Sequence, residues 1–201
     1  MVAGYGEQGL DEDVARGIEH AVDIFRALGV KVGTLRIPRL EGTIDLDPLF
    51  ALLRHEFHAA WGARWREADP ALFGPAVADD LRRGAAVGAT EYAAAQAACR
   101  DWRESFEQAL QQVDALLIPA MPTPAPLPDA MGRAGERGRP FLLPVSAAGL
   151  PAIATPTGLD RSGLPLGMQL VGRRNDEATL LRLAHAHQQA TGYHMLRPRP
   201  G

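Results

Sequence analysis

The sequence predicts an α/β protein in which helices are layered on a mixed β-sheet. Three stretches predict it: a helix followed directly by a strand in residues 11–37, a nearly continuous apolar run at 113–118, and a loop with a β-hairpin at 144–172. A continuous apolar run is typical of a strand covered on both faces, as in a parallel or mixed sheet under helices. The length of 201 residues predicts one domain, or a piece of a larger one.

Composition excludes several classes of function. The formal net charge is −3 with both signs interspersed, so we expect neither a nucleic-acid nor a membrane partner. Cys99 is the single cysteine, which excludes an internal disulfide framework and a cysteine metal cluster. No apolar run approaches the roughly 18 residues of a membrane span, and no signal-peptide pattern follows Met1. We therefore expect a cytoplasmic protein.

The first half of the chain is predicted to be mainly helical. Residues 11–28 carry apolar side chains at helical spacing, with Asp11 or Asp13 as the N-cap and Gly29 just after the last turn. The other elements expected in this half are the end of a strand at residues 2–6, a strand at 30–37 that Pro38 ends, and helices at 46–66, 76–83 and 90–111, the last capped by Thr90.

The hairpin is the most sharply defined element of the second half. Gly-Leu-Pro steps at Gly149 and Gly163 each open a strand, because proline fixes φ and has no N–H to give to a ladder. In the second strand Leu166, Met168 and Leu170 fall on one face, and Gln169 falls on the other.

The hairpin is flanked by less regular segments. Residues 119–144 hold seven prolines and three glycines without an apolar period, which predicts a long irregular loop. A closing helix is expected at 176–190, ended by Gly192, and residues 197–201 are expected to be a frayed tail.

Outside the hairpin, we considered two residue types, histidine and cysteine, as candidates for metal binding or catalysis. His55 and His58 are one residue short of the HExxH spacing of helical zinc sites, and no third ligand is near them, so we expect solvated or core-edge histidines rather than a metal site. Cys99 lies among alanines and is expected to be a small buried hydrophobe rather than a reactive thiol.

Several motifs resemble the C-terminal end of the amidase signature family. They are the run DALLIPAMPTPAP at residues 114–126 and the paired strands GLPAIATPTG and GLPLGMQLVG, followed by an acidic residue that opens a leucine-rich helix. The resemblance covers nearly the whole chain, and the motifs come in the family's order. It implies a single partial amidase-like domain over residues 1–201, with an α/β fold and a link to hydrolysis of linear amide C–N bonds.

The resemblance also implies which chemistry is missing. Family members use a serine nucleophile that a second serine and a lysine activate, and that triad lies upstream of every motif matched here. This chain has Lys31 as its only lysine and three separate serines, Ser105, Ser146 and Ser162. No catalytic residue can be assigned, and we expect weak or no amidase activity from the chain alone.

The substrate-binding candidates come from the same resemblance. In the family, the segment before the first Gly-Leu-Pro step lies close to the bound acyl group. This implies substrate contacts at Leu142, Val145 and Ser146, with the proline-rich loop as a rim. The alternative is that these residues only pack the loop onto the sheet.

The resemblance argues against a glutamine-binding site. The glutamine-using branch of the family has paired arginines before the glycine that aligns with Gly84. Asp79 and Asp80 occupy those positions here.

Two functional interpretations remain open. The chain is either the C-terminal portion of an amidase or a binding or regulatory module that keeps an amidase-like scaffold without the chemistry. In the first case, exposed sheet edges predict self-association or pairing with a separate N-terminal chain, and a small amide is the substrate of the completed enzyme. A metal hydrolase built on the two helical histidines is a third interpretation. We expect no cofactor and no metal.

Overall fold

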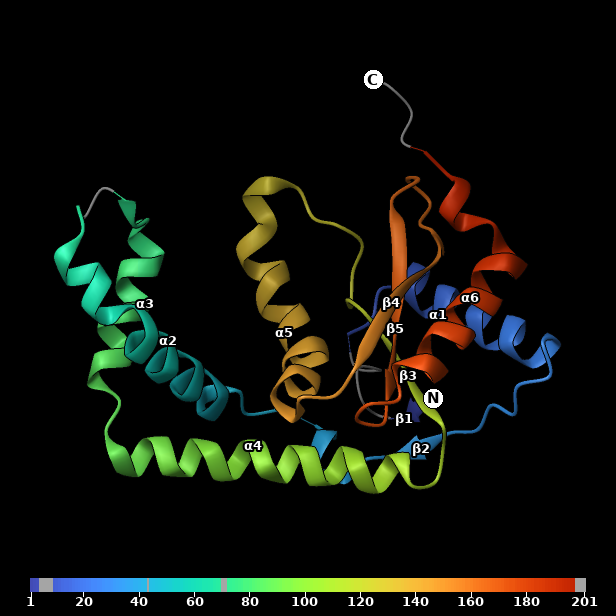
Figure 1. The fold of residues 1–201 in the computed structure, drawn as a ribbon. Helices are drawn as coiled ribbons and strands as arrows, with labels where there is room; N and C mark the ends of the chain where they lie inside the picture. The colour runs from blue at the N-terminus through green and yellow to red at the C-terminus, as the bar shows by residue number, and fades with distance from the viewer. Residues whose placement is uncertain (4–8, 43, 70–71, 198–201) are drawn as a thin grey trace. The chain divides into compact units, whose positions relative to one another are not determined.

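A computed structural model describes residues 1–3, 9–42, 44–69 and 72–197 (Figure 1). The chain divides into two compact units. Unit 1 comprises Met1–Ile44 and Arg103–Gly201, and unit 2 comprises Asp45–Trp102. The single domain expected over residues 1–201 stays a prediction. The strands and helices are β1 Val2–Ala3, α1 Glu12–Ala27, β2 Leu35–Arg36, α2 Asp47–Glu67, α3 Pro75–Ala86, α4 Ala89–Leu110, β3 Ala115–Pro119, α5 Met131–Ala148, β4 Ala152–Leu159, β5 Pro165–Gly172 and α6 Glu177–Thr191.

The α/β class is confirmed, and β5 is the central strand of the main sheet. The order is β3-β5-β4, and both pairings are antiparallel. Leu170 is the register partner of Leu117 on one side and of Ile153 on the other. The predicted hairpin is therefore present. The two-residue strands β1 and β2 form a separate parallel pair.

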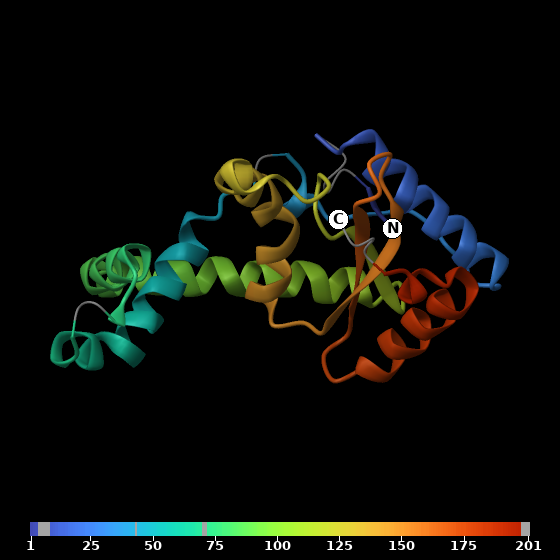
Figure 2. The same cartoon turned by 90° about the horizontal axis from the view of Figure 1, so that it is seen from above.

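Helices cover both faces of this sheet. Helices α1 and α6 lie on one face and α5 lies on the other, as both views of the ribbon show (Figures 1 and 2). Met168 and Leu170 are almost fully buried on the α1/α6 face, where they belong to the main apolar core. The helical members of that core are Ile18, Ala21, Val22 and Phe25 from α1 and Leu180 and Ala184 from α6.

Helix α1 begins and ends as its sequence predicts. The Asp11 side chain accepts a hydrogen bond from the Asp13 backbone N–H, which satisfies one of the free donors of the first turn. Gly29 follows the helix with φ of 83°, in the left-handed region that glycine enters without strain.

Gly17 lets α1 approach the sheet closely. A Cβ atom at this position would lie 2.8 Å from Thr157 Oγ1 of β4. Thr157 is itself buried, so neither partner has open space into which it could move.

The loop predicted at residues 119–144 is wrong over its second half, where α5 begins at Met131 and contains Pro140 and Pro144. Each proline removes one backbone donor, which is why the sequence favours a loop. The helix forms because burial outweighs that loss. Its sheet-side residues, Gly138, Phe141, Val145 and Ala148, are buried.

Two further boundaries differ from prediction, and two expected segments lie partly outside the described residues. The strand expected at 30–37 shrinks to Leu35–Arg36, because only this dipeptide pairs with β1. Helix α4 starts at Ala89, so Thr90 lies inside it and is not its cap. Of the expected strand end at 2–6, residues 4–6 lie outside the described residues, and the expected tail at 197–201 does so after residue 197.

Unit 2 consists of α2, α3 and the first part of α4. Gly84 of α3 packs against α2 so closely that a Cβ atom there would collide with the Arg54 carbonyl oxygen. Arg54 also donates to Asp80 Oδ1 at 2.9 Å, which joins the same two helices through a half-exposed ion pair.

Replacing Gly17 by alanine tests the close approach of α1 and β4. The new methyl group would press on Thr157 Oγ1, so we expect the free energy of unfolding to fall by roughly 1–2 kcal/mol, although alanine is the better helix former. Urea unfolding monitored by circular dichroism measures the change.

Two further variants control this prediction. In a Thr157→Ala background the oxygen is gone, and Gly17→Ala should then cost little. Gly33→Ala places its methyl group where nothing lies within 4 Å, so it should change stability by less than about 0.5 kcal/mol. Equal losses from the two glycine substitutions would contradict the close packing.

Candidate functional site

The three predicted substrate-binding residues all lie on α5 but not on one surface. Leu142 is 40% exposed and Ser146 is exposed, and because they are four residues apart they share one face of the helix. Val145 is 3% exposed and lies on the sheet side. The structure thus brings Leu142 and Ser146 together at the surface and places Val145 beneath them.

Ser146 is held by its own helix. Its Oγ atom donates a hydrogen bond of 3.3 Å to the Leu142 carbonyl oxygen, one turn earlier. This bond keeps the hydroxyl close to the backbone, as is common for serine inside a helix.

A buried amide from β5 fixes the position of α5. Gln169 is 5% exposed, and its Nε2 atom donates to the Phe141 carbonyl oxygen at 2.7 Å and to the Pro119 carbonyl oxygen at 3.5 Å. The first bond reaches α5 and the second, longer one reaches the end of β3. The sequence placed Gln169 on the face opposite Met168, but nothing in it indicated this role.

A second hydrogen bond from outside the helix holds the C-terminal end of α5. Gly149 adopts φ of 65° and ends the helix in the left-handed conformation. Arg103 Nε donates to the Ala148 carbonyl oxygen at 3.0 Å. A cation at this end of a helix is favourable because the free carbonyl groups there carry partial negative charge.

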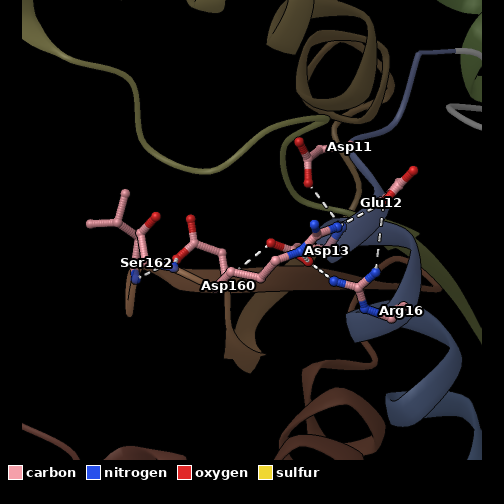
Figure 3. A network of polar contacts seen from close by, with 8 residues as sticks. Asp11, Glu12, Asp13, Arg16, Asp160 and Ser162 are labelled. Atoms are coloured by element: carbon pink, nitrogen blue, oxygen red, sulfur yellow. Dashed lines mark hydrogen bonds and ion pairs between the residues drawn. The ribbon is translucent and has the colours of Figure 1, made fainter.

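The turn of the hairpin is anchored to the first turn of α1 by a polar network (Figure 3). Arg161 donates from its backbone N–H to Asp13 Oδ2 at 3.1 Å and from Nε to Oδ1 at 3.0 Å, and its Nη2 reaches Glu12 Oε2 at 2.7 Å. Arg16 pairs with the same Asp13 carboxylate. Within the turn, Asp160 Oδ1 accepts the backbone N–H groups of Ser162 and Leu164 at 2.8 and 2.7 Å. These charges are paired with one another, and the network ties the turn of the hairpin to the start of α1.

The two histidines considered for a metal site both contact residues of unit 2, and His55 Nδ1 is buried without a hydrogen-bond partner. His58 Nδ1 lies 2.9 Å from the Leu81 carbonyl oxygen. The His55 ring lies against the Tyr92 ring, with centroids 4.3 Å apart. Across the described residues, no group of three or more His, Cys, Asp or Glu side chains is arranged to hold a metal ion. Cys99 is buried, as its surroundings in the sequence predict.

Lys31 lies far from the serines near the hairpin. It borders an open hollow of about 830 Å³ that Phe25 and Leu170 also line, which places it on the α1/α6 side of the sheet and beyond the C-terminal end of α1. Ser162 lies beside the N-terminal end of α1, and the 16 residues of that helix span roughly 24 Å. Ser146 is on α5, across the sheet.

Known proteins resemble this chain in both sequence and fold. The family model described as amidase matches residues 1–181. The chain belongs to the amidase family. Among curated relatives, a glutamyl-tRNA(Gln) amidotransferase subunit of Geobacter metallireducens is 30% identical over 94% of this chain and 44% of its own length. The protein of the same name from Picosynechococcus is 32% identical over 96% and 45%. This amidase-family chain thus spans a little under half the length of these relatives.

Solved structures agree on the fold. The structure of 6-aminohexanoate cyclic dimer hydrolase matches with a TM-score of 0.83 at 19% sequence identity. The match covers 98% of this amidase-family chain and 46% of the hydrolase chain. A crystal structure described as amidase matches 92% of this chain and 43% of its own with a TM-score of 0.77 at 27% identity. None of the described helices has the length and apolarity needed to cross a lipid bilayer.

Two substitutions of Gln169 test its role in holding α5. Gln169→Met leaves the Phe141 carbonyl oxygen without its side-chain donor, and we expect a loss of about 1–3 kcal/mol that does not vary with pH. Gln169→Glu also aims a buried carboxylate at carbonyl oxygens, and at pH 7 it should cost more than the methionine variant.

The pH dependence separates the two variants. Burial raises the pKa of the introduced carboxyl, whose protonated form can donate a hydrogen bond, so the glutamate variant should gain stability relative to the methionine variant as pH falls from 7 to 5. Urea unfolding at both pH values measures this, with Gln112→Glu at an exposed position as the control. A difference in the free energy of unfolding between the two variants that stays constant with pH would contradict the predicted geometry.

Proposed function

We propose that this chain forms the C-terminal part of an amidase signature hydrolase and does not carry the nucleophile. In this proposal a serine, activated by a second serine and a lysine from outside these 201 residues, attacks the carbonyl carbon of a linear amide. A neutral lysine can accept the serine proton, and backbone N–H groups can stabilise the oxyanion. The chain contributes the scaffold and one wall of the acyl-binding site.

The separation of Lys31 from Ser146 and Ser162 is the observation that supports this most strongly. A serine nucleophile needs its base within hydrogen-bonding reach. Ser162 lies at the other end of α1, and Ser146 lies on the other side of the sheet, where its hydroxyl bonds to its own helix. Neither of these two serines has Lys31 as a neighbour that could take up a proton.

The exposed face of α5 is the proposed contact surface for the acyl group. Leu142 supplies an apolar side chain and Ser146 a hydroxyl on this face, while Val145 packs underneath and keeps the helix against the sheet. Gln169 and Arg103 hold the two ends of the same helical segment through Phe141 and Ala148. A wall fixed in this way can position a substrate without taking part in bond making.

The edges of the sheet support the proposal that another polypeptide segment completes the fold. Within the described three-stranded sheet, β3 and β4 are the outer strands, and each has a ladder partner only in β5. Unpaired strand edges readily accept a further strand. We propose that this segment comes from residues N-terminal to the part described here or from a separate chain. A second copy of this chain would compete with it for the unpaired strand edges.

Glutamine is a poor candidate for the substrate. The positions that resemble the paired arginines of the glutamine-using branch hold Asp79 and Asp80, which form ion pairs with Arg83 at 2.7 Å and with Arg54 at 2.9 Å. Carboxylates at these positions offer no partner for a substrate carboxylate. We propose a substrate that is a neutral amide.

Activity measurements on the purified 201-residue chain test the central part of this proposal. We expect turnover of an aryl amide such as acetanilide to stay at the rate of the uncatalysed reaction. Turnover that a serine-reactive phosphonate abolishes would show a nucleophile within this chain and overturn the proposal.

The other part of the proposal is that a segment outside this chain supplies the catalytic triad. Co-expression tests it, with a polypeptide that carries a Gly/Ser-rich triad segment and is taken from the reading frame upstream of this sequence. We expect phosphonate-sensitive activity to appear. In that complex Leu142→Ala should raise KM more than it lowers kcat, because the side chain contributes binding and no chemistry. Leu181→Ala, at an exposed leucine of α6, is the matched control.

A further inference from the structure

The open hollow that Lys31 borders has the size of a ligand-binding site. It lies between the connection that follows α1, the first residues of β3 and the first turns of α6. Its volume is about 830 Å³, within the range of roughly 300–1,000 Å³ that holds small organic ligands. All of its lining residues belong to unit 1.

The floor of the hollow is apolar and continues the main core. Phe25, Leu117 and Leu170 of that core line it. Among the described residues, six half-buried hydrophobic residues pack against the core, and all but Ile153 line this hollow. These are Met1, Val30, Val32, Ala115 and Leu183. The half-buried margin of the core is thus concentrated here, and an apolar group in the hollow would remove further hydrocarbon surface from water.

Arg182 places a guanidinium group at the wall of the hollow. Its Nη2 atom donates to Thr179 Oγ1 at 3.0 Å, and Thr179 Oγ1 donates in turn to Asp176 Oδ1 at 2.8 Å. Because Thr179 also lines the hollow, these two bonds hold the guanidinium group beside it. Arg182 is exposed and makes no further hydrogen bond or ion pair within the described residues, so its other N–H groups are accessible to a ligand.

The side chains of the lining carry an excess of positive charge. Lys31 is exposed, and its ammonium group forms no ion pair in the part of the chain that the structure describes. Asp114 is the one carboxylate among the lining side chains, and it pairs with Arg173 at 3.2 Å. The charges of Lys31 and Arg182 therefore favour an anion in the hollow.

The apolar floor and the two cations together select the class of ligand. A purely apolar molecule would cover the floor but would offer no acceptor to the guanidinium group that it desolvates. An inorganic anion would pair with the cations but leave the floor in water. A molecule with an alkyl chain and one carboxylate satisfies both, and a carboxylate matches the fork of N–H groups on an arginine.

We propose that this hollow binds an aliphatic monocarboxylate. The carboxylate accepts hydrogen bonds from the free N–H groups of Arg182, and Lys31 adds to the positive potential. The alkyl chain lies on Val30, Val32 and Leu183. No step of this proposal depends on amide hydrolysis, so it stands or falls separately from the proposed function.

Octanoate is the probe that tests it, in calorimetric titrations of the 201-residue chain. We expect saturable binding of octanoate, and 1-octanol, which lacks the charge, should bind at least roughly fivefold more weakly. Each methylene removed between octanoate and butanoate should weaken binding roughly two- to fourfold.

Methyl NMR spectra locate the bound molecule. We expect octanoate to shift the methyl signals of Val30, Val32 and Leu183. The methyl signals of Leu181, an exposed leucine of the same helix that does not line the hollow, should stay in place as an internal reference.

Two substitutions separate the charged from the apolar contribution. Arg182→Gln should weaken octanoate binding roughly fivefold or more and leave 1-octanol binding unchanged, whereas Arg100→Gln, at an exposed position outside the hollow, should change neither. Leu183→Ala should weaken the binding of both probes, and the arginine variant keeps the test valid if this variant does not fold.

Three results would overturn the proposal. Unsaturated shifts shared by Leu181 and Leu183 would mean non-specific adsorption of the alkyl chain. Equal affinity of the wild-type chain and the Arg182→Gln variant for octanoate would mean that the carboxylate is not recognised. A wild-type chain that is dimeric by light scattering, and that Leu183→Ala makes monomeric, would mean that a second copy covers the hollow.

Discussion

Strand β5 has both edges paired and both faces covered, and α1, α5 and α6 all take their positions from it. On one face Met168 and Leu170 enter the apolar core with α1 and α6. On the other, Gln169 reaches α5 through a single short hydrogen bond to the Phe141 carbonyl oxygen. The apolar contacts are numerous and non-directional, whereas the hydrogen bond from the Gln169 amide group fixes one helix at one point. Because successive side chains of β5 point to opposite faces, this one strand makes non-directional apolar contacts on one face and a directional hydrogen bond on the other.

This arrangement bears on the role proposed for α5. A helix with two internal prolines and three glycines has little intrinsic stability, and here it is fastened near Phe141 by Gln169 and at Ala148 by Arg103. Between these two points lie Leu142 and Ser146, the exposed residues that the family resemblance connects with the acyl group. A surface that is held from beneath can present side chains to a substrate with little reorganisation.

The sequence predicted those elements that depend on local signals. The Gly-Leu-Pro steps and the alternation around Met168 predicted the hairpin, and Asp11 and Gly29 predicted the ends of α1. It did not predict α5 from Met131 onward, because that helix depends on contacts that are distant in the sequence. These are the burial of Phe141 and Val145 and the hydrogen bond from Gln169 of β5, a strand that follows α5 in the sequence.

The candidate site was predictable only through the family resemblance, which pointed to α5 without its geometry. The burial of Val145 and the exposure of Leu142 depend on which face of α5 meets the sheet.

Native-state hydrogen exchange of the chain, followed residue by residue by NMR, tests the central position of β5 most directly. The structure predicts that the amide protons of β5 exchange most slowly of all, and that those of α5 after Phe141 lose protection when Gln169 is replaced by methionine. Exchange from β5 as fast as from α2 and α3, or α5 protection that is unchanged in the variant, would contradict it.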